Sequence, residues 1–441
     1  MDWLNASAAE QGRAIAAGKA CPVDLTEAYL EAAAAHPEGA RIYARLTGER
    51  ARAEAMAARA RARAGLGRGP LDGVALSWKD LFDSAGVATE AGSKLLKGRV
   101  PDADAEVLRR ATLQGTVCLG KTHMTELAFS GLGVNPSTAT PPNAHDALLA
   151  PGGSSSGAAV SVAMRLAAAA VGSDTGGSVR IPAAWNDLVG LKTTHGRLPL
   201  TGVVPLCARF DTVGPLARTV EDCALVFAAL DGGHPADLRG ASLVGARLLV
   251  LEGLPLEDVR EEPRKGFEAA VDRLAAAGAR LERRTLGMVD AAMALSGVLF
   301  APEAYGLWKD VIEANPKAMY PLILERFRTG ANVLAADYVA AWAALDRFRS
   351  EWRAATEGYD AILVPTSPIL PPVAARLISE PAYFASENLL ALRNTRIGNI
   401  FGLSVLTLPT GLPATGISLM TAPGAEERLL RLGVACEAAL G

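Results

Sequence analysis

The stretch Gly-Ser-Asp-Thr-Gly-Gly-Ser-Val-Arg, residues 172–180, is the most informative part of the sequence for predicting the fold and its functional site. Glycine has no Cβ, so backbone N–H groups around adjacent glycines can converge on one point. Such a nest can hold the oxyanion that develops when a carbonyl group is attacked. Ser178 stands near the end of the stretch, where its hydroxyl could be the attacking group. A turn of small residues is the alternative, and these residues alone do not decide between the two.

A second cluster of glycine and serine lies upstream, at Pro151–Gly157 (PGGSSSG). It precedes an apolar segment, so it could cap a helix or bind a phosphate. Ser155 also fits the G-x-S-x-G pattern of a nucleophile elbow. That elbow needs a strand before it, and residues 145–151 do not have the pattern of a strand. The elbow is therefore disfavoured.

A lysine supplies a candidate base. The segment Gly73–Trp78 (GVALSW) has the pattern of a short buried strand that ends at Lys79. Burial disfavours the ammonium form of lysine, and a neutral amine can accept a proton. A pair with Asp80 is the alternative, although neighbouring side chains on a strand point to opposite faces. None of the five histidines stands beside a clear nucleophile, which argues against a Ser-His-Asp enzyme.

Two further patterns are expected to carry no chemistry. Residues 115–122 match the spacing of a phosphate-binding P-loop, G-x-x-x-x-G-K-T. The intervening residues 116–119 are β-branched or apolar, so they predict a strand rather than a flexible loop. His123 and Glu126 could be two metal ligands, but no third is evident. We therefore expect neither a metal nor another cofactor.

Composition excludes several other classes of protein. The net charge of -3 gives no bulk field that would attract nucleic acid or an anionic membrane. The arginine-rich residues 49–68 alternate with alanine and glutamate, which predicts a solvated helix face rather than an RNA-binding patch. The longest apolar run, residues 157–172, contains Ser161 and Arg165 and is too short to span a bilayer. Five scattered cysteines indicate no disulfide framework or zinc site. We expect a cytoplasmic protein.

Strands are predicted to alternate with helices, which implies α/β layers around a buried sheet. Residues 1–65 are expected to be helical, and no repeat or linker divides the chain, so a single domain over residues 1–441 is predicted. The expected strands are 73–78, 116–119, 246–251, 279–285, 361–364 and 404–408, with a short one near 172. The expected helices are 104–114, 157–170 and 262–277, with others between 289 and 357.

Together these segments resemble the amidase signature family. The resemblance is dense over about residues 70–222 and is carried by several ordered motifs. They are residues 69–73 (GPLDG), 79–80 (KD), 119–128 (LGKTHMTELA), 151–157, 172–180, 190–192 (GLK) and 213–222 (VGPLARTVED), with 365–368 (PTSP) and 406–409 (LTLP) further on. The resemblance implies a single large α/β domain with a central mixed β-sheet covered by helices on both faces.

The resemblance also implies a Ser–cis-Ser–Lys triad. In this sequence Ser178 would be the nucleophile, Ser154 the serine in a cis peptide linkage and Lys79 the base. The oxyanion hole would be formed by the backbone N–H groups of Thr175, Gly176, Gly177 and Ser178. We expect Ser155 to support Lys79 by a hydrogen bond, and Asp174 and Arg180 to brace the loop as a pair.

The function implied is an amidohydrolase that cleaves a carboxamide C–N bond of a small substrate through a seryl acyl-enzyme, releasing ammonia or an amine. The alternative is the glutamine-hydrolysing subunit of a tRNA-dependent amidotransferase. The family often has Asn, Gly and Pro where this chain has His123, Ser156 and Thr193. These departures leave the triad intact but weaken any inference about the substrate. Neither nucleic acid nor membrane is expected as a partner, and a homodimer is the assembly considered.

Residues 392–399 (LRNTRIGN) resemble a stretch in family branches that act on small, polar, urea-derived amides. Arg393 or Arg396 could hold a substrate carboxylate through two parallel hydrogen bonds. The alternative is that both arginines pair with acidic residues at the surface.

Overall fold

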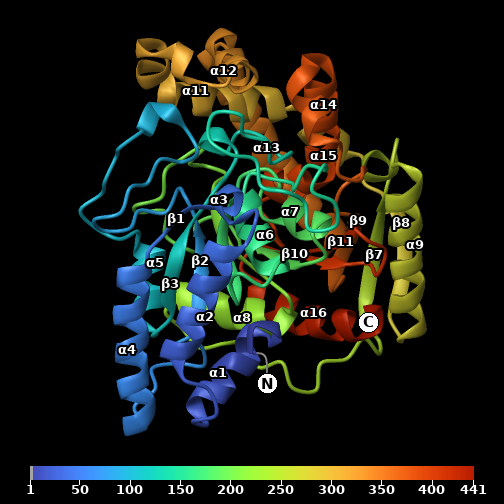
Figure 1. Ribbon diagram of the computed structural model, residues 1–441. Helices are drawn as coiled ribbons and strands as arrows, with labels where there is room; N and C mark the ends of the chain where they lie inside the picture. The colour runs from blue at the N-terminus through green and yellow to red at the C-terminus, as the bar shows by residue number, and fades with distance from the viewer. Residues whose placement is uncertain (1–2) are drawn as a thin grey trace.

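A computed structural model describes residues 3–441. Eleven strands form a single sheet with the order β1-β3-β2-β4-β6-β5-β10-β11-β9-β7-β8 (Figure 1). The strands are β1 (Tyr43–Leu46), β2 (Ala75–Lys79), β3 (Val117–Thr122), β4 (Ala169–Asp174), β5 (Val189–Lys192), β6 (Thr212–Ala217), β7 (Arg247–Glu252), β8 (Arg280–Thr285), β9 (Ala361–Pro365), β10 (Ser404–Pro409) and β11 (Gly416–Thr421).

The direction of the strands determines where the functional loops lie. Strand β2 runs parallel to both of its neighbours, β3 and β4. Leu76 is opposite Ala169 and Trp78 is opposite Val171. Parallel strands end at the same edge of a sheet, so the segments that follow β2 and β4 emerge side by side. The pairs β4–β6 and β10–β11 are antiparallel, so the sheet is mixed, as predicted.

Helices connect and surround the strands. They are α1 (Ala8–Ala16), α2 (Pro22–Ala35), α3 (Gly39–Ile42), α4 (Gly48–Ala64), α5 (Glu106–Leu113), α6 (Ser156–Ala163), α7 (Arg180–Trp185), α8 (Val220–Asp231), α9 (Glu261–Ala276), α10 (Met288–Ala294), α11 (Ser296–Ala314), α12 (Pro321–Arg328), α13 (Ala335–Thr356), α14 (Ala374–Ser379), α15 (Pro381–Ile400) and α16 (Glu426–Leu440). Short 3-10 helices lie at 3–5, 94–96, 126–128, 254–256, 316–318 and 329–332.

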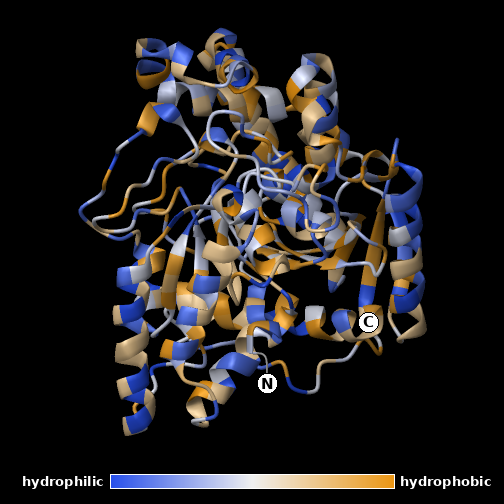
Figure 2. Cartoon of the chain, in the orientation of Figure 1, coloured by the Kyte–Doolittle hydropathy of each residue, from blue (hydrophilic) through white to orange (hydrophobic). Residues whose placement is uncertain are grey.

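Both faces of the sheet are covered. Alternate residues of a strand point to opposite faces. Ala170 of β4 and Leu216 of β6 pack with residues of α6 and α7, whereas Val171 belongs to the main core with Cys223 of α8. Figure 2 shows the central strands coloured as hydrophobic, while the outer helices α4 and α9 mix hydrophilic and hydrophobic positions. The predicted layer arrangement is confirmed.

Two local predictions were wrong. The helix expected over residues 157–170 ends at Ala163, and Ala169 already belongs to β4. Alanine favours helix, but packing in the sheet overrides that preference in this run. The N-terminal segment, expected to be helical throughout, contributes the edge strand β1, which pairs with β3.

The segment with P-loop spacing is part of the sheet. Strand β3 extends to Thr122 and therefore contains Lys121. The buried Lys121 donates a hydrogen bond to Thr89 Oγ1 at 2.9 Å and lies 3.3 Å from Asp80. No helix among residues 3–441 is both long enough and apolar enough to cross a membrane.

Candidate active site

Three segments of the chain meet at the edge of the sheet where β2 and β4 end. Lys79 is the last residue of β2, Ser154 precedes α6, and Ser178 lies between β4 and α7. All three residues are buried, Ser178 being 4% exposed. The two serine loops are joined directly, because the Ser155 N–H donates to the Ser178 carbonyl at 3.2 Å. The fold therefore brings together residues that are far apart in the sequence.

The Lys79 amine points at two hydroxyl groups. Its Nζ donates to Ser154 Oγ at 2.7 Å and to Ser173 Oγ at 2.8 Å. The peptide bond between Gly153 and Ser154 is cis, as the family resemblance implies. Lys79 thus contacts neutral oxygen atoms that can bind either an amine or an ammonium group.

Burial controls the charge on Lys79. It lowers the pKa of Lys79 to about 7, even though Asp174 and Asp211 act in the opposite direction. Asp80, which follows Lys79 in the sequence, faces away from it and forms ion pairs with Arg45 at 2.7 Å and Lys121 at 3.3 Å. The strand alternation predicted this separation. Lys79 can therefore be neutral near neutral pH.

The predicted hydrogen bond between Ser155 and Lys79 was wrong, because Ser155 has a different partner. Ser155 Oγ lies against the backbone of Ser173: it donates to the Ser173 carbonyl at 3.2 Å and accepts from the Ser173 N–H at 3.3 Å. Ser173 is the residue that reaches Lys79, so Ser155 acts one step further away. Sequence reasoning missed Ser173 because only the packing of β4 beside β2 places its hydroxyl next to the amine.

Asp174 and Arg180 form the predicted pair beneath the loop. Arg180 Nη2 and Nε donate to the two carboxylate oxygens of Asp174 at 2.8 and 3.0 Å. Burial would raise the pKa of Asp174, but Arg180 outweighs that effect and holds the pKa well below its usual range. Arg180 also donates to the Thr395 carbonyl and to Asn399 Oδ1, both at 2.6 Å. The pair therefore ties the loop to α15.

One of the four N–H groups predicted for the oxyanion hole is already engaged. The Gly177 N–H donates to Asp174 Oδ1 at 2.9 Å, which leaves Thr175, Gly176 and Ser178 as candidate donors. Gly177 has φ 141°, and a Cβ there would lie 2.2 Å from Thr395 Oγ1, so only glycine fits. Thr175 Oγ1 donates to the buried Asp211 at 2.5 Å. Sequence reasoning gave Asp211 no role.

The Asp174–Arg180 pair gives a stability prediction. We expect Arg180→Met to reduce the free energy of unfolding by about 3–5 kcal/mol, because it leaves a buried carboxylate without its partner. Urea denaturation would measure the loss. The matched control is Arg197→Met, whose ion pair with Asp231 is partly exposed and whose loss should have little effect. Equal losses in the two variants would contradict the bracing role.

A cavity of about 330 Å³ opens over Ser178. Thr175 and Gly176 line it beside the nucleophile, and much of the remaining wall is apolar. The large apolar side chains are Phe129, Leu206, Phe300, Leu389 and Leu392. A volume of this size is at the small end for ligand sites.

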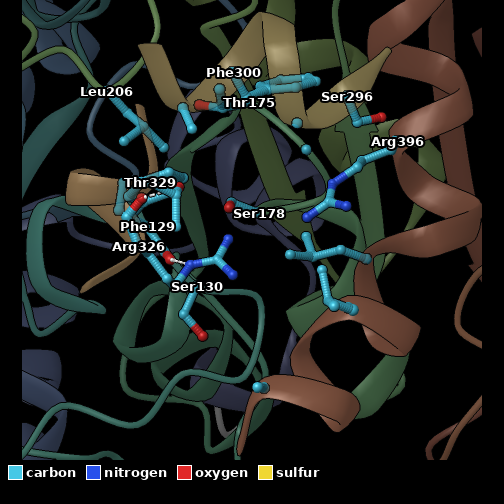
Figure 3. A pocket seen from close by; sticks show the side chains of 17 residues that line it. Phe129, Ser130, Thr175, Ser178, Leu206, Ser296, Phe300, Arg326, Thr329 and Arg396 are labelled. Atoms are coloured by element: carbon cyan, nitrogen blue, oxygen red, sulfur yellow. Dashed lines mark hydrogen bonds between the residues drawn. The ribbon is translucent and has the colours of Figure 1, made fainter. Parts of the chain in front are cut away.

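The two arginines predicted as substrate ligands lie in different places. Arg396 lines the cavity, with its guanidinium pointing toward the region of Ser178 (Figure 3). Arg393 lies one helical turn earlier and does not line it, because its guanidinium donates to the Glu257 carbonyl. A second cavity arginine, Arg326 of α12, was not predicted. Its segment carries no motif, and only the tertiary fold places it opposite Arg396.

Comparisons with known proteins point to one family. A family model described as Amidase matches residues 24–430. The 2-amino-5-chloromuconic acid deaminase of Comamonas testosteroni is 37% identical over 413 residues, covering 90% of this chain and 88% of the relative. A glutamyl-tRNA(Gln) amidotransferase subunit from Moorella thermoacetica is 34% identical, covering 84% and 83%. The native peptide amidase of Stenotrophomonas maltophilia has a crystal structure that matches with TM-score 0.83 and 28% identity, covering 99% and 97%.

The chain therefore belongs to the Amidase family, as its signature motifs predict. It is an enzyme of the hydrolase class that acts on carbon–nitrogen bonds other than peptide bonds.

Proposed function

We propose that this enzyme hydrolyses the carboxamide C–N bond of a small substrate through an acyl-enzyme on Ser178. The observation that carries the proposal is the 2.7 Å contact between Lys79 Nζ and Ser154 Oγ, buried beside a nucleophile that opens onto the cavity. A lysine with a pKa of about 7 can act as a base at neutral pH. Ser154 then carries protons between Lys79 and Ser178.

The first half of the reaction forms a tetrahedral intermediate on Ser178. Neutral Lys79 takes a proton from Ser154 Oγ, which in turn takes the proton from Ser178 Oγ. Ser178 Oγ bonds to the carbonyl carbon, and the carbonyl oxygen becomes an oxyanion. The backbone N–H groups of Thr175, Gly176 and Ser178 are the proposed donors to that oxyanion.

The second half releases the products. The proton on Lys79 passes through Ser154 to the leaving nitrogen, the C–N bond breaks, and ammonia or an amine departs. A water molecule then gives a proton to the same relay and attacks the acyl carbon. When the ester bond to Ser178 breaks, its oxygen recovers a proton and the acid leaves. Each residue of the relay therefore ends the cycle in the state in which it began.

The substrate is proposed to be a small organic acid derivative. The cavity volume of about 330 Å³ favours a compact molecule, and its apolar wall suits a hydrocarbon skeleton. The relative from Comamonas testosteroni is named as a deaminase of 2-amino-5-chloromuconic acid, which supports an acid as the substrate class.

Hydrolysis of glutamine within an amidotransferase is the second candidate, because relatives of that name match at up to 34% identity. The cavity speaks against it. Glutamine carries an α-ammonium group, which needs an acidic partner, and none of the described residues lining the cavity is acidic. The cavity instead presents Arg326 and Arg396, which would repel an ammonium group. The cytoplasmic location and the homodimer stay predictions.

Trapping the acyl-enzyme tests the proposal. A panel of small amides, including glutamine, would be screened by ammonia release, and the ethyl ester of the best substrate's acid would then be mixed with the enzyme and quenched in acid. We expect peptide mass spectrometry to find the acyl group on Ser178. An acyl group on another residue would contradict the assignment of Ser178 as the nucleophile. So would the absence of both a burst of product release and a covalent acyl adduct. Preferential hydrolysis of glutamine would favour the second candidate.

A further inference from the structure

Two arginines line the cavity without an acidic partner. Arg326 Nε donates to the Phe129 carbonyl at 2.8 Å, and its guanidinium lies 4.7 Å from the centre of the Phe129 ring. The side chain of Arg396 makes no hydrogen bond or ion pair within the part of the chain that the structure describes. Both guanidinium groups point into the cavity from different walls (Figure 3). Their charged ends are therefore free to contact a ligand.

Both guanidinium groups are partly enclosed by protein, and no acidic side chain of the described cavity lining offsets their charge. Enclosure by protein lowers the pKa of Arg396 to about 10, and enclosure together with Arg396 lowers the pKa of Arg326 to about 9. Charges removed from bulk water are normally paired. Arg180, two residues from the nucleophile, is paired in this way, because its guanidinium lies 2.8 Å from the Asp174 carboxylate. The cavity arginines differ from it because they have no such partner.

The two arginines approach the reacting position from different directions. Arg396 lies against residues 175–178, whose backbone N–H groups are proposed to bind the oxyanion. A Cβ placed on Gly176 would be 3.6 Å from Arg396 Cγ. Arg326 comes from α12 and is held against Phe129 on another wall. In Figure 3 Ser178 is seen between the two guanidinium groups. A ligand that contacts both arginines therefore extends across the entrance to the nucleophile.

We propose that Arg326 and Arg396 form a subsite for a small dianionic substrate, in which each guanidinium binds one carboxylate. The inference rests on the proposed function, since it specifies the substrate class for the same nucleophile. A guanidinium presents two parallel N–H donors that match a carboxylate. Two carboxylates would balance the two positive charges of a lining that contains no acidic residue within residues 3–441.

The rest of the wall favours dicarboxylates over phosphate compounds. The cavity wall also offers large apolar side chains, among them Phe129, Phe300 and Leu392. These suit a short hydrocarbon chain between two charged ends. A sugar phosphate would instead place several hydroxyl groups against these apolar side chains, which costs affinity. Inorganic phosphate is therefore a useful comparison ligand for the experiment.

Calorimetric titration of the full chain carrying Ser178→Ala tests the subsite without turnover. The probes are matched series of four to six carbons, such as glutaramide, glutaramate and glutarate, which carry zero, one and two carboxylates. In at least one series we expect each added carboxylate to increase affinity by about tenfold or more, with phosphate binding more weakly than the dicarboxylate. Equal affinity within every series would overturn the proposal, and so would failure of every dicarboxylate to bind.

Four further substitutions in this background identify the residues responsible. Arg326→Gln and Arg396→Gln should each weaken dicarboxylate binding at least about tenfold and leave the diamide almost unchanged. The matched control is Arg393→Gln, on the same helix but outside the cavity, which should not alter the preference. An unchanged preference in either cavity variant would overturn the role of that arginine. Thermal unfolding checks the fold, and Arg326→Lys, which keeps the charge, should bind with intermediate affinity.

Failure of this proposal can be distinguished from failure of the proposed function. If the acyl group is trapped on Ser178 but the probes show no charge preference, the subsite is wrong and the amidase mechanism stands. If no acyl-enzyme forms but the preference for dicarboxylates depends on both arginines, the subsite stands and the nucleophile is wrong.

Discussion

Ser178→Ala is expected to lower the rate of amide hydrolysis by at least ~10³-fold, in line with loss of the nucleophile in other serine hydrolases. The substitution removes only Oγ and keeps the backbone N–H that is proposed to bind the oxyanion. Ser178 is buried and lines the cavity, and its carbonyl would still accept from the Ser155 N–H. Ammonia release measures the rate, and thermal unfolding should show an intact fold.

A matched serine variant makes this result specific. Ser156 is also buried, but its Oγ contacts the His123 carbonyl at 3.4 Å and has no place in the relay. Ser156→Ala should therefore keep most of the activity. If Ser178→Ala instead retained more than a few per cent of wild-type activity, the nucleophile would have to be another residue, with Ser155 the next candidate.

Lys79→Ala and Lys79→Arg are both expected to lose at least ~10²-fold in rate, the lower end for general base catalysis. Alanine removes the base. Arginine keeps a positive charge but stays protonated, so it cannot accept the proton of Ser154. The two variants should therefore be similarly inactive when kcat is measured on the best amide. An active arginine variant would show that the position supplies only charge, and the relay would have to be abandoned.

The dependence of kcat/KM on pH shows whether the neutral or the protonated form of Lys79 is active. Burial lowers the pKa of Lys79 to about 7, so the amine is protonated and inactive below that pH and neutral above it. We expect activity to rise as pH increases through about 7. Burial also lowers the pKa of Lys192 to about 7, so Lys192 could be mistaken for the base.

A control variant separates these two lysines. Lys192 donates to the carbonyls of Thr193 and Leu403, and it does not line the cavity. Lys192→Met should therefore keep the rising limb of the pH profile. Loss of that limb in Lys192→Met would show that the titrating group is not Lys79.

Local patterns were enough to predict the parts of the site that lie on short, distinctive segments. Lys79 follows an apolar run that has the pattern of a short buried strand, and Ser178 ends a glycine-rich loop. Strand alternation also predicted that Asp80 faces away. The linking of these segments into one site came from the family resemblance, because no local pattern specifies which loops meet at an edge of the sheet.

The residues that sequence reasoning missed depend on long-range packing. Ser173 reaches Lys79 only because β4 lies beside β2. Arg326 reaches the cavity only because α12 packs near Phe129, a contact across 197 positions of the chain. The alanine run that ends in β4 has neither helical nor strand periodicity, so the boundary near residue 169 was not predictable. Arg393 and Arg396 could not be separated because both lie in one motif.

Helix α15 supports the nucleophile loop and also carries Arg396 of the proposed subsite. Arg180 binds the Thr395 carbonyl and Asn399, Thr395 Oγ1 donates to the Gly176 carbonyl at 2.7 Å, and Arg396 lies between them in the sequence. A substitution that shifts this helix therefore disturbs catalysis along with recognition. Arg326 is attached to the site mainly through the Phe129 carbonyl. We therefore expect substitutions on α12 to change substrate preference with little effect on the nucleophile loop, whereas substitutions on α15 should affect both.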